Sequence, residues 1–225
     1  IEVGANSSTP RLMKILEKRG FKPESVTYVI VTHVHLDHAG GAGSLMQLLP
    51  NATLLVHPYG ARHMIDPSRL EAGTRAVYGD ALFDKMYGKL IPVPEERVRI
   101  MEDGDEVSLG ERRLRFMDTP GHARHHFCVH DSLTNGWFTG DTFGLSYREF
   151  DTQKGAFLLP TTTPVQFDPD VLRVSVNERV DSRPDCMYLT HYGRVDDVPN
   201  LAAKMLEGID VFTRIAEQYK NDDQR

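Results

Sequence analysis

The chain has 225 residues and a formal net charge of −6, with 40% hydrophobic and 26% charged residues. This composition is typical of a globular protein with a sizeable core, so we expect one domain over residues 1–225. The net negative charge disfavours a surface that binds nucleic acid or a membrane, so we expect a small-molecule substrate. A homo-oligomer is an open possibility. Two cysteines and the absence of an apolar run of about 18 residues or a signal peptide favour the cytoplasm.

The first predicted elements alternate between helix and strand. Apolar residues at helical spacing predict a helix over Pro10–Arg19, and the β-branched run Val26–Thr32 predicts a strand buried on both faces. A helix over Ser44–Leu49 and a strand over Thr53–Val56 follow. This order is typical of a layered α/β protein.

The rest of the chain divides into a helical stretch, a run of strands and two late helices. Residues 58–88 have a mostly helical pattern, which we expect Pro67 and Gly73 to interrupt. Short strands separated by turn residues predict an antiparallel meander over Val98–Met101, Glu106–Leu109, Arg112–Met117, Phe127–His130 and Gly136–Thr139. Helices over Asp168–Val180 and Val198–Tyr219 flank a last strand at Met187–Thr190.

A histidine-rich stretch, THVHLDHAGG at residues 32–41, begins where the first buried strand ends. It places three histidines and an aspartate within six positions, which suits neither a helix face nor a core strand, because neutral imidazole buries badly without partners and charged imidazoles repel one another. A bound metal would resolve this conflict. Ligand sites in α/β folds gather at the carboxyl ends of strands, so the position of the stretch favours a site.

Three further strand ends carry side chains that can bind a metal. They are His122 in TPGH, Asp141 in TGDT and His191 in LTHYG. With the histidine-rich stretch they complete a set of seven candidate ligands: His33, His35, Asp37, His38, His122, Asp141 and His191. Five imidazoles and two carboxylates without a thiolate suit zinc, manganese, iron or cobalt, and two divalent ions rather than one.

These motifs, in this order, resemble the metal motifs of the metallo-β-lactamase fold superfamily. The matching segments are THVHLDHAGG, TPGHARHH, FTGDTFG and LTHYG. The resemblance implies a four-layer αββα sandwich of two sheets covered by helices. It also implies a dinuclear site like that of glyoxalase II, with one metal held by His33, His35 and His122, a second by Asp37, His38 and His191, and Asp141 bridging both. The segments VHPYGARHMIDPSRL and LLPTTTPVQFDP further resemble a subgroup of archaeal and bacterial metallohydrolases, a match that implies no substrate.

The start of the chain departs from the family pattern. Where the superfamily usually has an aspartate in a turn after an early strand, this chain has Glu2 in Ile1-Glu2-Val3-Gly4. The strands that normally precede this turn are not in the sequence, and we expect that they were trimmed or are absent.

The resemblance implies a hydrolase of an ester, thioester or lactone, in which a metal-bridging hydroxide is the nucleophile. Zinc is the expected metal, with iron or manganese as alternatives, and Asp37 is the expected catalytic residue that orients the hydroxide or relays a proton. An alternative of a different class is a mononuclear non-heme iron dioxygenase of the persulfide-oxidising type, with iron on His33, His122 and Asp141. The sequence alone separates the two poorly.

Two tyrosines and five other histidines have open roles. Tyr147 and Tyr192 could each donate a hydrogen bond to an oxyanion in the substrate, or could form the wall of the site. The remaining histidines are expected in packing or supporting roles rather than as ligands, and His126 is the one most suited to support a ligand: His57, His63, His125, His126 and His130.

Overall fold

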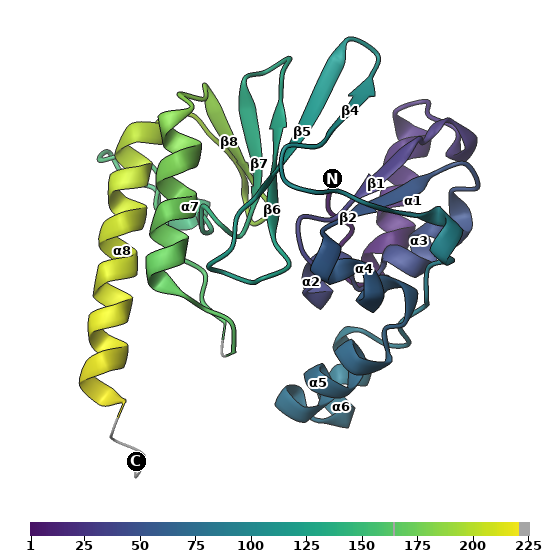
Figure 1. Ribbon diagram of the computed structural model, residues 1–225, viewed down its shortest axis with the longest axis horizontal. Helices are drawn as coiled ribbons and strands as arrows, with labels where there is room; N and C mark the ends of the chain where they lie inside the picture. Colours follow the sequence, from purple (N-terminus) through teal and green to yellow (C-terminus); the bar gives the residue numbers. More distant parts are fainter. Residues whose placement is uncertain (164, 221–225) are drawn as a thin grey trace. The chain divides into compact units, whose positions relative to one another are not determined.

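The computed structural model describes residues 1–163 and 165–220 and forms two compact units, Ile1–Glu102 and Asp103–Arg225. Each unit contains one β-sheet and its own helices (Figure 1). In the described part of the chain, no helix combines the length and the apolar character needed to cross a membrane.

The first unit is built on a sheet of three parallel strands. In sheet order these are β1 (Tyr28–Ile30), β2 (Thr53–Val56) and β3 (Val98–Ile100). Its helices are α1 (Thr9–Lys18), α2 (Leu36–Ala39), α3 (Ala42–Leu48), α4 (Pro58–Ile65), α5 (Ser68–Tyr78) and α6 (Asp80–Met86), and short 3₁₀ turns cover Asn6–Ser8, Pro23–Ser25 and Glu95–Arg97. Parallel strands require crossover connections, which these helices provide. Val29 and Leu54 from the sheet and Leu45 from α3 pack in one buried core.

The strand at Val98 lies in a different sheet from the one predicted. We expected it in the antiparallel meander, but β3 pairs parallel with β2, with Leu54 opposite Val98. The chain leaves this sheet after Met101, whose N–H donates to the carbonyl of Val56, whereas the N–H of Gly104 donates to the carbonyl of Phe116 in the second unit. The Asp103-Gly104 turn therefore connects two sheets, and a local turn signal cannot distinguish this from a hairpin.

Two local predictions for the helical stretch have different outcomes. Pro67 separates α4 from α5 as expected, but the predicted interruption at Gly73 is wrong because α5 runs through it. An exposed glycine costs a helix only about 1 kcal/mol relative to alanine. Arg75 offsets this cost, since it pairs with Glu71 one turn earlier and with Asp84 of α6.

The second unit is built on a mixed six-stranded sheet. In sheet order the strands are β4 (Glu106–Leu109), β5 (Arg112–Asp118), β6 (Phe127–Asp131), β7 (Gly136–Gly140), β8 (Cys186–Leu189) and β9 (Gly193–Val195). All neighbours are antiparallel except β7 and β8, which are parallel. The meander from the second predicted strand onward is thus confirmed. The short strand β9 was not predicted.

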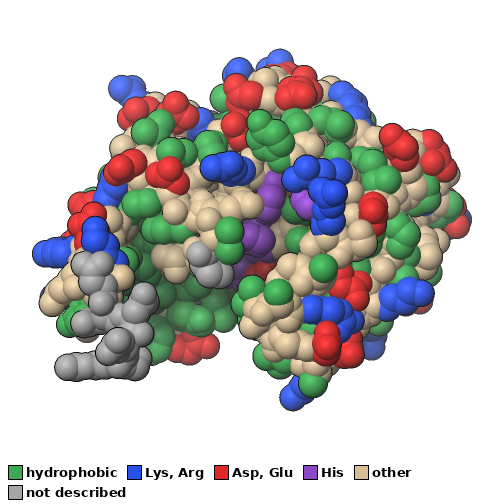
Figure 2. Space-filling model, turned by 60° about the horizontal axis from the view of Figure 1, so that its bottom comes forward, with side chains coloured by type: hydrophobic (Ala, Val, Ile, Leu, Met, Phe, Trp, Pro, Cys, Tyr) green, Lys and Arg blue, Asp and Glu red, His purple; other side chains and the backbone are tan. Residues whose placement is uncertain are grey.

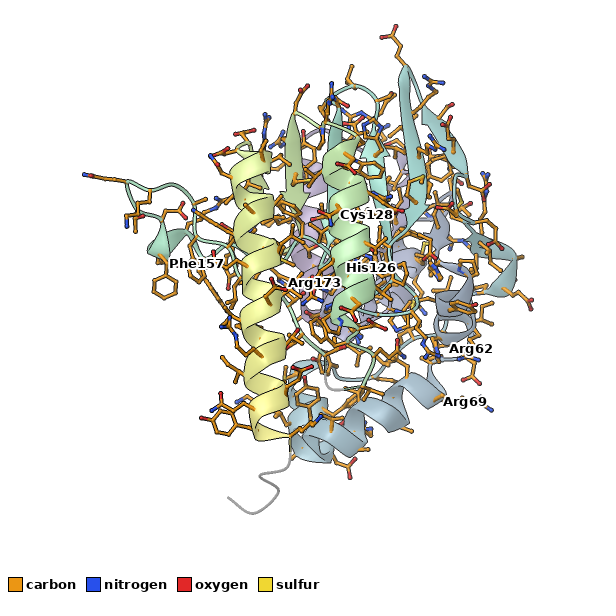
Figure 3. All side chains as sticks on the ribbon, turned by 60° about the vertical axis from the view of Figure 1, so that its left-hand side comes forward. Arg62, Arg69, His126, Cys128, Phe157 and Arg173 are labelled. Carbon is orange, nitrogen blue, oxygen red and sulfur yellow. The ribbon has the colours of Figure 1, made fainter. Side chains whose placement is uncertain are left out.

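Helices α7 (Pro169–Asp181) and α8 (Val198–Tyr219) pack side by side in this unit (Figure 1), and a 3₁₀ turn covers Arg148–Phe150. Leu172 and Val176 of α7 and Met205 of α8 are fully buried against the core that Met187 of β8 also enters. Arg173 lies between the two helices (Figure 3) and donates to Asp210 of α8. The two helices predicted from the sequence are therefore confirmed, with ends within one or two residues.

Candidate metal centre

The first group of candidate ligands follows β1 in the first unit. Residues 33–35 are non-helical, and Asp37 and His38 lie on α2, a single helical turn that was not predicted. Nε2 of His33 lies 2.9 Å from Nδ1 of His35, and the rings of His33 and His38 are 3.9 Å apart between centroids. His33 and His38 are fully buried. The structure therefore brings these three imidazoles together, as the sequence predicted for a metal-binding stretch.

Glu2 and Thr32 lie against this group. The Thr32 hydroxyl donates to Oε1 of Glu2 over 2.5 Å and lies 3.1 Å from Nδ1 of His33. The other carboxylate oxygen, Oε2 of Glu2, is 3.3 Å from Nδ1 of His38. From the sequence, Glu2 was noted only as a departure from the family pattern. Nothing in the position of Thr32 predicted that its hydroxyl would contact both Glu2 and His33.

Asp37 differs from the histidines because half of its side chain is exposed. Its Oδ2 lies 3.5 Å from Nε2 of His38. Burial, followed by the negative charge of Asp37, raises the pKa of Tyr87 to about 12. Tyr87 therefore lies within electrostatic range of the predicted catalytic aspartate. Tyr87 follows α6 and is far from Asp37 along the chain, so the sequence did not predict that the two residues interact.

The second group of candidate ligands lies at one edge of the six-stranded sheet. His122, Asp141 and His191 follow the carboxyl ends of β5, β7 and β8, which run in the same direction. Oδ2 of Asp141 lies 3.4 Å from Nε2 of His122, and Oδ1 lies 3.5 Å from Nε2 of His191. The two oxygens of one carboxylate therefore face two different imidazoles.

Two threonines from a distant segment hold this second group. The Thr161 hydroxyl donates to the carbonyl of Asp141 over 2.9 Å and lies 3.1 Å from Nδ1 of His122. The Thr163 hydroxyl donates to the carbonyl of His122. Both belong to the stretch LLPTTTPVQFDP, which the sequence marked only by its resemblance to a subgroup.

His126 contacts the backbone of the candidate ligand Asp141, as expected for a supporting residue. His126 lies just before β6, and Cys128 lies in the strand near its start (Figure 3). Nε2 of His126 accepts the backbone N–H of Asp141 over 3.1 Å, and its Nδ1 lies 2.8 Å from the hydroxyl of Thr119. The same hydroxyl donates to the sulfur of Cys128, which is buried.

The two predicted substrate-binding tyrosines contact one another. The rings of Tyr147 and Tyr192 are 4.7 Å apart between centroids, and Tyr192 is 49% exposed. Partial removal from water, then a hydrogen bond to Tyr147, raises the pKa of Tyr192. Tyr192 also has a φ of +79°, and Arg148 donates to its carbonyl. Their contact with substrate stays a prediction.

Other histidines have structural contacts. Nδ1 of His57 accepts the N–H of Tyr59 at the start of α4, and Nε2 of His130 lies 3.2 Å from the side-chain oxygen of Asn135. Burial, then the charges of Arg62 and Arg69, lowers the pKa of His63. These contacts agree with the packing roles expected for them.

The donor chemistry of both groups fits divalent metal ions. Imidazole nitrogens and carboxylate oxygens are ligands for zinc, iron and manganese. Nε2 of His33 and Nδ1 of His35 lie 2.9 Å apart, so both nitrogens could reach one ion. A carboxylate whose oxygens face different imidazoles has the form expected of a bridge between two ions.

Comparisons of this chain with family models, curated proteins and solved structures all identify the same family. The family model described as the metallo-β-lactamase superfamily matches residues 1–191. A metallo-β-lactamase fold-containing protein of Sulfurisphaera tokodaii is 29% identical over 176 residues, which are 76% of this chain and 62% of that protein. A solved structure of an archaeal superfamily member from Sulfolobus tokodaii has a TM-score of 0.68 and 28% identity, covering 80% of this chain and 66% of that one.

Two other relatives are named as hydrolases. An acyl-coenzyme A thioesterase of Gallus gallus is 32% identical over 116 residues, 50% of this chain and 40% of that protein. A hydroxyacylglutathione hydrolase of Maricaulis maris is 30% identical over 138 residues, 61% of this chain and 42% of that protein. The chain spans between 40% and 62% of the length of the three curated relatives.

Proposed function

The chain belongs to the metallo-β-lactamase superfamily and has its fold, and from this premise we propose that it is a metal-dependent hydrolase. The observation that carries the proposal is the carboxylate of Asp141, with one oxygen toward His122 and the other toward His191. A bridging carboxylate of this kind is useful where two ions must be held a short distance apart.

The proposed ligands are those assigned from the motifs. His33, His35 and His122 would hold one ion, Asp37, His38 and His191 the other, and Asp141 both. When bound, the ions supply Lewis-acid activation of a water molecule and stabilisation of the charge that develops on the attacked carbonyl oxygen. Zinc is the proposed metal.

The protein's own residues would supply the remaining functions. The half-exposed carboxylate of Asp37 can accept and return a proton at the reacting water. The phenol of Tyr192 can donate to a substrate oxygen, because a tyrosine is protonated at neutral pH. No serine or cysteine nucleophile is required.

The proposed substrate is a small molecule with an ester, thioester or lactone bond. The thioesterase and the hydroxyacylglutathione hydrolase among the relatives support a thioester, and the motif resemblance supports the other two. On the face drawn in Figure 2, acidic and basic side chains are interspersed rather than gathered into a basic surface, which supports a small molecule over nucleic acid. A cytoplasmic location and a homo-oligomer stay predictions.

Elemental mass spectrometry of protein purified without chelator or added metal tests the proposal. About two ions per chain, together with hydrolysis in a panel of thioesters, esters and lactones, is the expected result. A single iron per chain, with oxygen consumption on a persulfide and no hydrolysis, would contradict it and favour the dioxygenase. Leu133→Ala, at an exposed turn residue, is the control variant and should hydrolyse the panel like the unmodified protein.

A further inference from the structure

The segment 157–163 is hydrogen-bonded to the loop that follows β7 in the same unit. Leu145 of that loop and Leu159 of the segment exchange two backbone hydrogen bonds of 2.9 Å. Gly144 permits this close approach, because a Cβ there would lie 2.3 Å from the carbonyl oxygen of Leu159. Thr161 lies two residues further along the segment, so these contacts determine where its side chain lies.

The hydroxyl of Thr161 connects two of the candidate ligands. Its oxygen lies 2.9 Å from the backbone carbonyl oxygen of Asp141 and 3.1 Å from Nδ1 of His122. A backbone carbonyl can only accept a hydrogen bond, so the single hydrogen of the hydroxyl is donated to Asp141. The hydroxyl oxygen must then accept from the ring of His122, which therefore carries its proton on Nδ1.

A second contact requires the same tautomer of His122. Its Nδ1 also lies 3.5 Å from the backbone carbonyl oxygen of Thr161, which has no hydrogen to donate. Both oxygens of Thr161 are therefore acceptors for the same ring N–H. The lone pair of the imidazole is left on Nε2, which lies 3.4 Å from Oδ2 of Asp141.

We infer that Thr161 is the positioning residue for two metal ligands at once, through the ring of His122 and the backbone of Asp141. The inference rests on the proposed metal centre. Nε2 of His122 and Oδ2 of Asp141 are both electron-pair donors, so a divalent cation bound by both would stabilise their close approach. A group that accepts the second ring N–H of a ligating histidine fixes its tautomer and orientation, and its loss typically costs about 10–100-fold in metal affinity.

The two threonines that follow Thr161 have different contacts, although their side chains are identical. The hydroxyl of Thr163 donates to the backbone carbonyl of His122 over 3.0 Å, which supports the loop without acting on the ring proton. Thr162 is exposed, and its hydroxyl makes no hydrogen bond to another residue that the structure describes. The three consecutive threonines therefore form a matched set for mutation.

Four variants separate the roles of these hydroxyls. Thr161→Val keeps the branched shape of the side chain but removes its hydroxyl, whereas Thr161→Ser keeps the hydroxyl. Thr162→Val is the matched control, and Thr163→Val removes only the hydrogen bond to the backbone of His122. Circular dichroism and thermal unfolding identify any variant that fails to fold, in which case Thr161→Ala replaces Thr161→Val.

Competition with a chromophoric chelator measures zinc affinity, and proton and nitrogen-15 NMR of the zinc-loaded protein detects the ring N–H of His122. In the unmodified protein we expect an Nδ1–H signal that exchanges slowly with water. In Thr161→Val we expect about 10–100-fold weaker zinc binding and faster exchange of this proton, because its nearer acceptor is lost. Thr161→Ser and Thr162→Val should keep the affinity and the signal of the unmodified protein, and Thr163→Val should keep the signal.

Three results would overturn the inference: a proton on Nε2 of His122, equal zinc affinities in Thr161→Val and Thr162→Val, or a Thr161→Ser protein that binds zinc as weakly as Thr161→Val. These measurements use no substrate, so they are independent of the hydrolysis assay. A protein with the expected zinc affinities that hydrolyses nothing would contradict the proposed function and leave the role of Thr161 intact. Equal affinities in a protein that hydrolyses the panel would overturn the role of Thr161 and leave the proposed function intact.

Discussion

The backbone N–H of Asp141 donates a hydrogen bond to Nε2 of His126 over 3.1 Å, and both residues are buried. Because Nε2 accepts, the ring proton of His126 is on Nδ1, which faces the hydroxyls of Thr119 and Thr142 at 2.8 and 3.2 Å. His126 thus connects the end of β7 to the loop after β5. It fixes the backbone from which the Asp141 carboxylate extends.

Replacing His126 should therefore affect both stability and metal binding. In His126→Ala the buried N–H of Asp141 loses its acceptor, which costs about 1–3 kcal/mol of unfolding free energy. We expect zinc affinity to fall about tenfold or more because Asp141 is less well held. Urea unfolding and zinc competition measure the two effects. His130→Ala, which removes a half-buried histidine bonded to Asn135, should lose stability without losing zinc affinity, and equal affinity losses in both variants would contradict the role of His126.

Asp141→Ala should remove the proposed bridge. We expect the metal content to fall from two ions to one or fewer per chain and hydrolysis to be lost, because no other side chain would join the ions. Elemental mass spectrometry and the thioester assay measure the two outcomes, with Asp181→Ala, an exposed residue at the end of α7, as the control. Unchanged turnover with two metals still bound would refute the bridging role.

Gly121 should tolerate no side chain. It has a φ of +123°, and a Cβ there would lie 2.5 Å from the backbone of Leu172, at the point where the loop carrying His122 packs on α7. Gly121→Ala should lower the unfolding free energy by about 1–3 kcal/mol or more from backbone strain alone.

Gly73→Ala is the matched control for this effect, with the opposite expected sign. Gly73 is inside α5, and a Cβ there would meet no atom within 4 Å. Alanine should raise the unfolding free energy by about 0.5–1 kcal/mol because it restricts the unfolded chain and favours the helix. Urea denaturation of both variants tests the pair. A stable Gly121→Ala protein would mean that the loop does not pack on α7 as described.

Tyr87 should make the protein less stable in strongly alkaline solution. Its pKa is about 12 in the folded state, against an ordinary value near 10, so below pH 10 the phenol is protonated in both states and has no effect. Between pH 10 and 12 the unfolded chain loses the proton while the folded chain keeps it, and the free energy of unfolding falls as pH rises. Urea unfolding across this range should show a smaller decline in Tyr87→Phe than in the unmodified protein. Tyr59→Phe, at an exposed tyrosine, should behave like the unmodified protein, and identical slopes in all three would contradict the assignment.

The candidate ligands were predictable from the sequence because their chemistry is local. Imidazoles concentrated from His33 to His38 directly after an apolar strand have few explanations other than a metal, and His122, Asp141 and His191 each follow a strand-like run. Helices α7 and α8 were predictable because each has a signal within a few residues. The side chain of Asp168 caps the start of α7 by accepting from two backbone N–H groups, and α8 has a periodic apolar face that includes the buried Leu201, Met205 and Ile209.

Only the tertiary structure decided which distant residues support these ligands. Thr161 contacts His122 from 39 residues away, Glu2 reaches Thr32 across 30, and β3 pairs with β2 on the far side of three helices instead of with β4, the strand that follows it closely. The entropy of closing a loop grows only slowly with its length, so many such pairings cost nearly the same and spacing along the chain cannot select among them. The packed core and its satisfied hydrogen bonds make that choice, which is why the sequence indicates the ligands and the fold determines how they are held.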